Sequence, residues 1–159
     1  MTGVQTCALP IFNSLEEFRR ITEELFEETD LLLTQKFLPT EFDWRVGVLS
    51  GAPLFVCQYR MARGHWQIVK HGADGSAREG GHRTFDIDQA PREVVDLAVR
   101  AARAVGDGLY GVDLKQTPNG IVVIEVNDNP NIEHGIEDAV GKDDVWIRIL
   151  KWFIERLGQ

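Results

Sequence analysis

Three oxygen-bearing side chains stand at a regular spacing in two neighbouring runs of the chain. Asp113 lies in the run 109–115, where apolar and polar residues alternate, and Glu125 and Asn127 lie in the run 121–127, which is rich in β-branched residues. Both runs are typical of β-strands. Because alternate residues of a strand point to the same side, Glu125 and Asn127 share one face. The two runs therefore hold two carboxylates and an amide that a hairpin could bring together.

The turn between the two runs decides whether these side chains meet. Residues 117–120, Thr-Pro-Asn-Gly, are a dense turn signal. An odd-numbered loop centred on Asn119 and ending in a left-handed Gly120 would place Asp113 directly opposite Glu125. A two-residue Asn119-Gly120 turn would shift the register by one residue and send Asp113 to the other face. The residues alone leave both turns open.

Two carboxylates directly opposite each other destabilise a hairpin, so we expect a positive group between Asp113 and Glu125. Oxygen ligands of this kind suit a hard cation such as Mg²⁺, which also bridges nucleotide phosphates. The alternative is structural, because polar residues also belong on the solvated face of an amphipathic hairpin. The pattern of the hairpin does not separate these two interpretations.

The residues that follow favour the metal site. After Glu125 the chain continues Val-Asn-Asp-Asn-Pro-Asn, a polar strand end that stops at a proline. Together with Gly-Val-Asp-Leu at 111–114, this pattern resembles the metal-binding end of the RimK-like ATP-grasp ligases. The resemblance extends over residues 12–157, nearly the whole chain. It implies that Asp113, Glu125 and Asn127 hold Mg²⁺ or Mn²⁺.

A second stretch of the same resemblance concerns the nucleotide. The run 35–45, Gln-Lys-Phe-Leu-Pro-Thr-Glu-Phe-Asp-Trp-Arg, resembles the hinge that receives the adenine of ATP in these ligases. The resemblance implies that the backbone of Lys36 and Phe37 contacts the adenine and that Asp43 holds the ribose. Many members carry Glu where this chain has Lys36, so only the backbone contact carries over. Without the resemblance, Asp43 fits the role of a turn residue at the start of a strand.

Three further residues complete the implied site. Asp-x-Arg recurs in the family at this point, and the resemblance implies that Arg45 orients the acyl phosphate, since its planar fork suits such oxygens. Trp66 and Gln67 occupy the family's next nucleotide-contacting position, although Trp66 fits a core position equally well.

The resemblance implies an enzyme, an ATP-dependent carboxylate–amine ligase. In the family, ATP phosphorylates a carboxylate, and an amine then displaces the phosphate to form an amide or peptide bond. The partners are accordingly a small-molecule or peptide carboxylate and an amine substrate, and a homo-oligomer is an option for the full-length protein. A ligase of the glutathione-synthetase type would differ only in its substrates.

The family also requires lysines and a Gly-rich loop from an upstream subdomain that covers the phosphates. We therefore expect this chain alone to be a ligase fragment that binds Mg²⁺–ATP weakly and does not catalyse ligation. The alternative is a non-catalytic module that binds a metal, a nucleotide or a partner without the phosphate-covering half.

The elements that must position these residues indicate an α+β fold. The resemblance implies the C-terminal subdomain of an ATP-grasp fold, truncated at the N-terminus, with a mainly antiparallel sheet packed with helices. Helices are expected after the capping box Ser14/Glu17, from Pro91, and over 145–157 with Asp143 or Asp144 as the cap. Besides the hairpin, strands are expected at 31–38, 43–49 and 54–60, and a Gly-rich surface loop at 70–84.

Composition limits the function classes. The formal net charge of −8 excludes an electrostatic footprint for nucleic acid, and no apolar run approaches the length of a membrane span. Two cysteines make no disulfide framework, so we expect a reducing compartment, the cytoplasm. Residues 1–11, Met-Thr-Gly-Val-Gln-Thr-Cys-Ala-Leu-Pro-Ile, resemble the translation of a sequencing adapter. We expect them to be unstructured and residues 12–159 to form a partial ATP-grasp domain.

Overall fold

The computed structural model describes residues 11–62, 69–71 and 77–158. The chain divides into two compact units, Met1–Leu38 and Pro39–Gln159, and each is described by itself. Every residue of the hairpin that carries the oxygen-bearing side chains belongs to the second unit.

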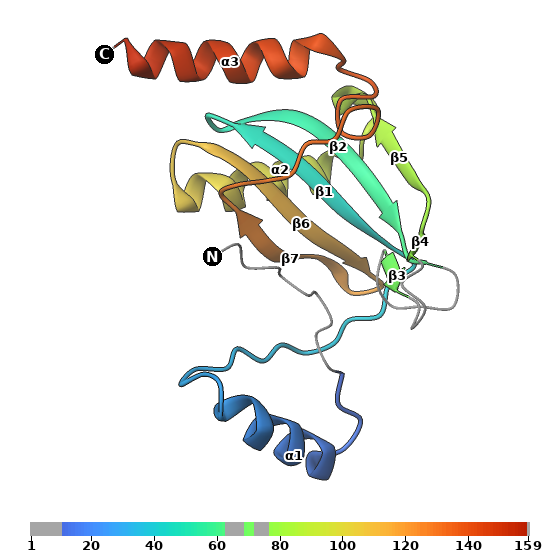
Figure 1. Cartoon of the computed structure of the whole chain (residues 1–159). Coiled ribbons are helices and arrows are strands. Elements are labelled where there is room, and N and C mark those ends of the chain that lie inside the picture. Colours follow the sequence, from blue (N-terminus) through green and yellow to red (C-terminus); the bar gives the residue numbers. More distant parts are fainter. Residues whose placement is uncertain (1–10, 63–68, 72–76, 159) are drawn as a thin grey trace. The chain divides into compact units, whose positions relative to one another are not determined.

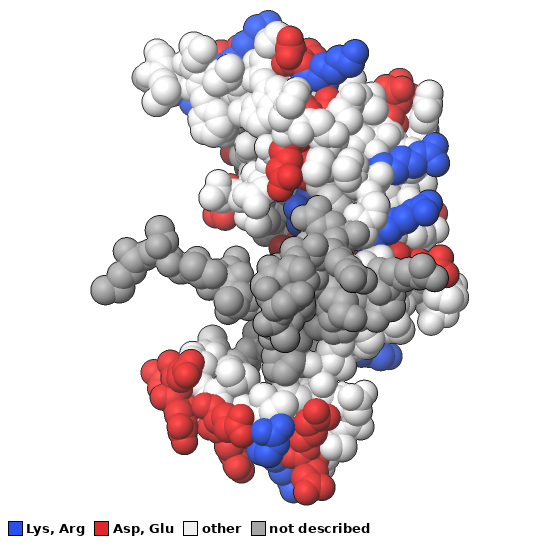
Figure 2. Space-filling model, turned by 45° about the vertical axis from the view of Figure 1, so that its right-hand side comes forward, with Lys and Arg blue, Asp and Glu red and all other residues white. Residues whose placement is uncertain are grey.

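The first unit contains one helix among its described residues, α1 (Leu15–Phe26). Its N-cap is Ser14, whose hydroxyl accepts a hydrogen bond from the backbone N–H of Glu17 at 3.1 Å. The Glu17 carboxylate reaches back and accepts from the backbone N–H of Asn13 at 3.0 Å. The predicted helix start is therefore confirmed, with the two side chains satisfying donors that the helix itself leaves free. Figure 2 shows acidic side chains gathered over this helix.

The strand predicted at 31–38 is wrong, because this segment of the structure contains no strand. Leu31 and Leu33 are 83% and 87% exposed. A run of leucines looks the same whether or not a neighbouring strand pairs with it, and a strand forms only where its N–H and C=O groups find partners.

The second unit is built on one five-stranded antiparallel sheet in the order β5-β2-β1-β6-β7 (Figure 1). The strands are β1 (Phe42–Leu49), β2 (Ala52–Arg60), β5 (His82–Phe85), β6 (Leu109–Thr117) and β7 (Gly120–Asn127). The order places β1 in the centre, with β2 on one side and β6 on the other. Side chains of β1 can therefore meet those of two hairpins that are distant in sequence.

One face of the sheet packs against α2 (Arg92–Val105). The buried stripe of α2 consists of Val94, Val95, Ala98 and Ala102. It meets alternate residues of the strands, and the largest of these are Trp44, Val46, Val48, Val56, Val112 and Leu114. The predicted helix start is confirmed to within one residue, since Pro91 is the N-cap of α2. Alternation along each strand then leaves the neighbouring residues on the opposite face.

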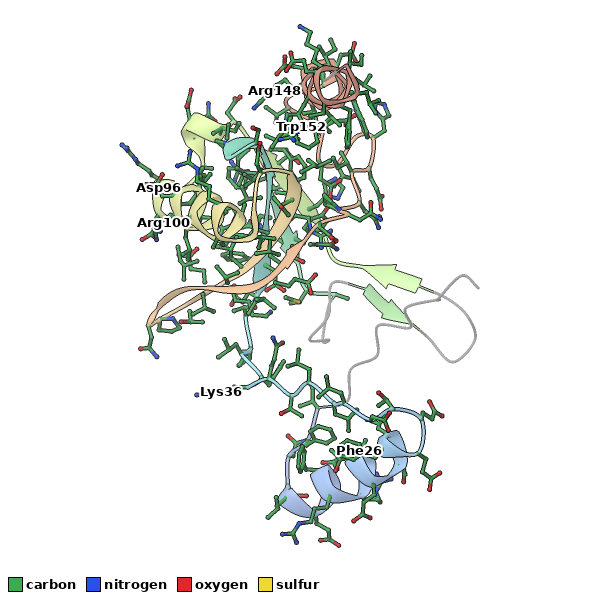
Figure 3. All side chains as sticks on the ribbon, turned by 90° about the vertical axis from the view of Figure 1, so that its left-hand side faces the viewer. Phe26, Lys36, Asp96, Arg100, Arg148 and Trp152 are labelled. Carbon is green, nitrogen blue, oxygen red and sulfur yellow. The ribbon has the colours of Figure 1, made fainter. Side chains whose placement is uncertain are left out.

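The opposite face is covered at one end by α3 (Asp143–Leu157). Val145 and Ile149 of α3 pack on Leu54 and Phe55, and Trp152 lies on the side of the helix that faces the sheet (Figure 3). The N-cap of α3 is Lys142 at φ 48°, so the predicted cap at Asp143 or Asp144 is wrong. Both acidic residues instead lie in the first turn, where they favour the helix through its dipole.

The Gly-rich loop predicted at 70–84 contains more structure than expected. A short pair of strands, β3 (Val69–His71) and β4 (Ala77–Glu79), is followed by the edge strand β5. The sequence of β5, His-Arg-Thr-Phe, has only one apolar residue, because an edge strand buries little of its surface. The 3₁₀-helix η1 (Ile87–Gln89) then leads into α2. In the described part of the chain, no helix has the length and apolar character that a membrane span requires.

Candidate metal and nucleotide site

Asp113 lies directly opposite Glu125, as the odd-numbered loop predicted. The turn itself is different, since Thr117 pairs with Gly120 and only Pro118 and Asn119 lie between the strands. A bulge corrects the register instead.

The bulge falls at Ile124. Leu114 pairs with Val123, and the next pair is Asp113 with Glu125, so Ile124 is left over between the two pairs. In a regular continuation Ile124 would stand opposite Asp113, and Glu125 would point to the α2 face. The extra residue turns Glu125 to the open face instead, which is the known effect of a β-bulge.

Asn127 lies on the same face, opposite Gly111. Its side-chain oxygen accepts a hydrogen bond from the backbone N–H of Asn129 at 2.9 Å, which turns the chain after the strand. Pro130 then lies over Gly111, where a Cβ would come within 2.7 Å of the Pro130 Cβ. The glycine thus permits the proline-stopped segment to fold back over β6, beside Asp113.

Arg45 supplies the positive group that the two facing carboxylates require. It is the direct partner of Asp113 across β1 and β6. Its Nε and one terminal nitrogen donate to the two oxygens of Asp113, both at 2.8 Å. The side chains of Arg45 and Asp113 are 28% and 23% exposed. The bond to Asp113 outweighs the opposing effect of burial and raises the pKa of Arg45.

Glu125 forms no such ion pair within the described residues and remains in conflict with its neighbour. Its pKa is raised by loss of solvation and by the negative charge of Asp113, and Arg45 offsets only part of this. A carboxylate in this position gains from any cation that binds beside it.

These residues fit a hard divalent cation. Asp113, Glu125 and Asn127 offer only oxygen ligands, which Mg²⁺ prefers. No cluster of three or more His, Cys, Asp or Glu side chains suited to a metal exists among the described residues, so two carboxylates and one amide are the set that this hairpin offers. Such a set suits Mg²⁺, which binds through one or two carboxylates and completes its shell with water and substrate phosphate.

Asp43 also lies on the open face, two residues before Arg45. Its Oδ1 accepts from Lys115 Nζ at 2.6 Å and from the Thr40 hydroxyl at 2.9 Å. Lys115 also donates to the Thr40 oxygen at 2.9 Å. Within the described residues both bonds go to Oδ1, so Oδ2 remains available to a ligand hydroxyl.

The remaining predicted nucleotide residues are not brought to this face by the described structure. Lys36 and Phe37 belong to the first unit, where both side chains are exposed; Figure 3 labels Lys36. Trp66 and Gln67 lie outside the described residues.

Sequence reasoning missed Tyr59 and Glu137, which complete the surroundings of Arg45. The Tyr59 hydroxyl donates to the carboxylate of Glu137, which is 1% exposed. The ring of Tyr59 lies 5.6 Å from the Arg45 guanidinium. The signal for Tyr59 was its phase, since it shares the face of Cys57, the direct partner of Arg45. Glu137 gave no signal, because it follows the motif in an irregular loop.

Asp138, next in this loop, holds the loop together. It accepts hydrogen bonds from Trp146 Nε1 at 2.8 Å, the Gly135 backbone N–H at 2.6 Å and His134 Nδ1 at 2.9 Å. These donors lower the pKa of Asp138 to about 2. Trp146, which the sequence placed in the core, therefore both packs and donates.

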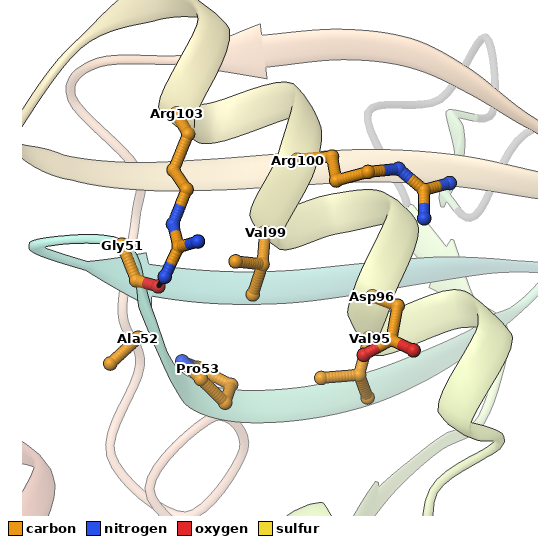
Figure 4. Close-up of a pocket in the computed structure, with 8 residues that line it drawn as sticks. All are labelled: Gly51, Ala52, Pro53, Val95, Asp96, Val99, Arg100 and Arg103. Atoms are coloured by element: carbon orange, nitrogen blue, oxygen red, sulfur yellow. Dashed lines mark hydrogen bonds between the residues drawn. The ribbon is translucent and has the colours of Figure 1, made fainter.

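A groove of about 470 Å³ lies elsewhere, between α2 and the β1–β2 turn (Figure 4). Val95 and Val99 form part of its lining, with Arg100 and Arg103 on one side. Arg103 donates to the Gly51 carbonyl at 2.9 Å. The groove belongs to the α2 side of the sheet and contains none of the predicted site residues.

Known proteins of one kind resemble this chain. A family model described as an ATP-grasp domain, the third family of its clade, matches residues 8–131. A probable alpha-L-glutamate ligase from Shewanella loihica is 41% identical over 78 residues, which are 48% of this chain and 26% of the relative. Another from Xanthomonas campestris pv. campestris is 36% identical over 115 residues, which are 70% of this chain and 37% of the relative. The matched part is therefore well under two thirds of the length of these relatives.

Solved structures agree on the fold. A D-alanine–D-alanine ligase from Bacillus anthracis superposes with a TM-score of 0.64 at 17% identity, over 89% of this chain and 48% of its own. Its complex with ATP gives a TM-score of 0.65 at 14% identity, over 92% and 50%. The predicted α+β fold and the resemblance to RimK-like ligases are thereby confirmed. With most of its length matched by the family model, the chain belongs to this ATP-grasp domain family.

Proposed function

We propose that this chain is part of an ATP-dependent carboxylate–amine ligase and that the open face of its sheet binds Mg²⁺–ATP. The observation that carries the proposal is the placement of Arg45, Asp113, Glu125 and Asn127 side by side on three adjacent strands. The family match and the curated relatives named as glutamate ligases support the same reaction class.

The charge of this face supports a divalent cation. Asp43, Asp113, Glu125 and Glu137 are four carboxylates, and among the described residues Arg45 and Lys115 are the two cations that lie between them. Two negative charges are left over. The raised pKa of Glu125 reports the same excess. A bound ion of charge two would balance this group of side chains.

The residues of the site would take distinct roles. Asp113, Glu125 and Asn127 would hold Mg²⁺, which when bound neutralises charge on the β- and γ-phosphates. Asp43 would accept a hydrogen bond from a ribose hydroxyl at Oδ2, with Lys115 and Thr40 fixing its other oxygen. Arginine has five N–H donors, and two of those of Arg45 are on Asp113. The others remain for substrate oxygens.

The reaction we propose has two steps. A substrate carboxylate oxygen attacks the γ-phosphorus of ATP and ADP leaves, which gives an acyl phosphate. The amine nitrogen then attacks the acyl carbon, expels phosphate and loses a proton, which gives the amide. Arg45 would hold the phosphoryl oxygens in both steps, where negative charge accumulates. Because the curated relatives are named for glutamate, it is the first substrate to test.

The test is a calorimetric titration of the 159-residue chain with ATP, with and without Mg²⁺. We expect binding that requires Mg²⁺ and that weakens roughly tenfold or more in Asp113→Asn and in Glu125→Gln, because each removes a metal ligand. Asp96→Asn is the matched control, since it removes an exposed carboxylate from α2 on the other side of the sheet.

Two results would count against the proposal. Binding of ATP that is indifferent to Mg²⁺ would remove the metal from the site. Equal affinity in wild type, Asp113→Asn and Glu125→Gln would place the nucleotide elsewhere.

A further inference from the structure

Arg45 lies at the meeting point of two groups that come from opposite sides. On β6 its direct partner is Asp113, which takes both hydrogen bonds. On β2 its direct partner is Cys57, and Tyr59 is the diagonal neighbour two residues further along. A diagonal position is within reach of an aromatic side chain, and the Tyr59 ring lies 5.6 Å from the guanidinium. The ring thus bounds the guanidinium on the side away from Asp113.

The Tyr59 ring is fixed by a buried carboxylate from another part of the chain. Its hydroxyl donates to Glu137 Oε1, while Glu137 Oε2 accepts from the Glu133 backbone N–H at 2.9 Å. Both oxygens of Glu137 therefore have donors, and its side chain is 1% exposed. Burial and the bond to Glu137 raise the pKa of Tyr59, so the phenol stays protonated as the donor.

The loop that carries Glu137 is tied to the sheet at a second point. The Thr84 hydroxyl on β5 donates to the Ile136 carbonyl at 2.5 Å, and the Cys57 sulfur lies 3.0 Å from the Thr84 oxygen. Burial raises the pKa of Cys57 to about 11, so its thiol stays neutral. Neighbouring residues 136 and 137 thus reach β5 and β2, and the loop cannot shift without moving Tyr59.

An anchor for the loop alone would not need a charge. A neutral side chain of the same shape could bond to the Tyr59 hydroxyl, and a charge buried without a cation nearby is costly. The nearby cation is Arg45, whose guanidinium gains from the negative charge of Glu137 as well as from Asp113. The loop, the ring and the guanidinium therefore form one electrostatic unit.

We propose that Tyr59 and Glu137 are positioning residues that hold the Arg45 guanidinium at the metal and phosphate site. Glu137 fixes Tyr59 and attracts the guanidinium, and the Tyr59 ring limits its rotamers. The loop after the metal-binding strand thereby acts on the site from β2. This inference rests on the proposed function only for its consequence, the binding of phosphoryl oxygens by Arg45.

The direct test observes Arg45 itself. The Nε–H of Arg45 gives a signal in a ¹H–¹⁵N spectrum, which its loss in Arg45→Lys assigns. We expect this proton to exchange with water roughly threefold to tenfold faster in Tyr59→Leu and in Glu137→Gln, because the guanidinium loses a constraint on its bond to Asp113. Tyr59→Phe keeps the ring and loses the bond to Glu137, so it should fall between. Tyr110→Phe, on β6, is the control and should not change the signal.

The second measurement is the affinity for Mg²⁺–ATP in the same variants. We expect it to fall roughly threefold to tenfold with the loosening of Arg45, in the order Tyr59→Phe, Glu137→Gln, Tyr59→Leu. A purely structural role would lower stability and leave the exchange of the Arg45 proton unchanged in the folded protein.

The two proposals fail in different ways. Unchanged Arg45 exchange in Glu137→Gln and Tyr59→Leu would overturn the positioning role, even if Mg²⁺–ATP binds. Faster exchange in a chain that does not bind Mg²⁺–ATP would support the positioning role and overturn the proposed function. Tyr59→Phe and Glu137→Gln are near-isosteric, so the test does not depend on the folding of Tyr59→Leu.

Discussion

The two faces of the five-stranded sheet are built from alternate residues of the same strands, yet they are held together by different forces. On the α2 face, Val46, Val112 and Leu114 are completely buried among apolar side chains. On the open face, the neighbours Arg45 and Asp113 are ion-paired and partly exposed. The first face obtains its stability from volume and the second depends on charge. Substitutions should therefore affect the two faces in different ways, and stability and ligand binding should separate.

The largest effect is expected from Leu114→Ala on the α2 face. Leu114 is fully buried, so the lost contacts and the remaining cavity should reduce the free energy of unfolding by about 2–5 kcal/mol. Urea denaturation measures this. The affinity of the folded protein for Mg²⁺–ATP should remain that of wild type, because Leu114 contributes nothing to the open face. A loss of affinity without a loss of stability would break the separation between the faces.

A smaller effect is expected from Gly47→Ala, at the covered end of the open face. A Cβ on Gly47 would come within 2.3 Å of the Phe55 ring, which lies over β1 under α3. The ring would have to move, and overpacking of this kind costs about 1–3 kcal/mol. Thermal unfolding would detect it. Gly120→Ala serves as a comparison for crowding, since a Cβ there meets nothing within 4 Å and only its positive φ causes strain.

The smallest effect on stability, and one of opposite sign, is expected from Glu125→Gln. Because the folded-state pKa of Glu125 is raised, folding disfavours its charged form. The resulting cost is absent below the ordinary pKa of 4.5 and grows as the pH rises through the raised value. At neutral pH the variant should thus be more stable than wild type by a few tenths of a kcal/mol, since Glu125 is exposed and screened by solvent.

The comparison of unfolding midpoints at pH 7 and pH 4 tests the sign of the Glu125 effect, because the gain should disappear at the lower pH. If Glu125→Gln were less stable than wild type at pH 7, the two carboxylates would not be in conflict. The same variant should bind Mg²⁺–ATP poorly, so the open face trades stability for ligand binding.

The parts of this fold that local pattern could predict are those that local contacts decide. Ser14 and Glu17 cap a helix three residues apart, and the partner of Asp113 lies twelve residues away at Glu125. The α2 stripe follows from its helical spacing. Arg45 was assigned through its resemblance to a family, because its partner Asp113 is 68 positions away and no spacing shows that β1 lies beside β6.

The parts that pattern missed depend on distant partners or hidden phase. The bulge at Ile124 is invisible, since the run 121–124 is apolar throughout and carries no alternation to mark a change of phase. Glu137 lies 78 positions from Tyr59 and reads as a solvated loop residue until the loop is seen folded onto the sheet. The strand predicted at 31–38 failed for the opposite reason, because its residues are apolar but pair with no strand that the structure describes.

The bulge at Ile124 also determines which changes of length this hairpin can accept. If Ile124 were deleted, Glu125 would follow Val123 and stand opposite Asp113 in regular pairing, so the carboxylates would still meet. If Val123 were deleted instead, Ile124 could take its place opposite Leu114 with the same outcome, because the bulge holds one spare residue. A second deletion would find no spare residue and would reverse the two faces of the strand end. Relatives of this chain can therefore differ by one residue in this strand and retain the same site.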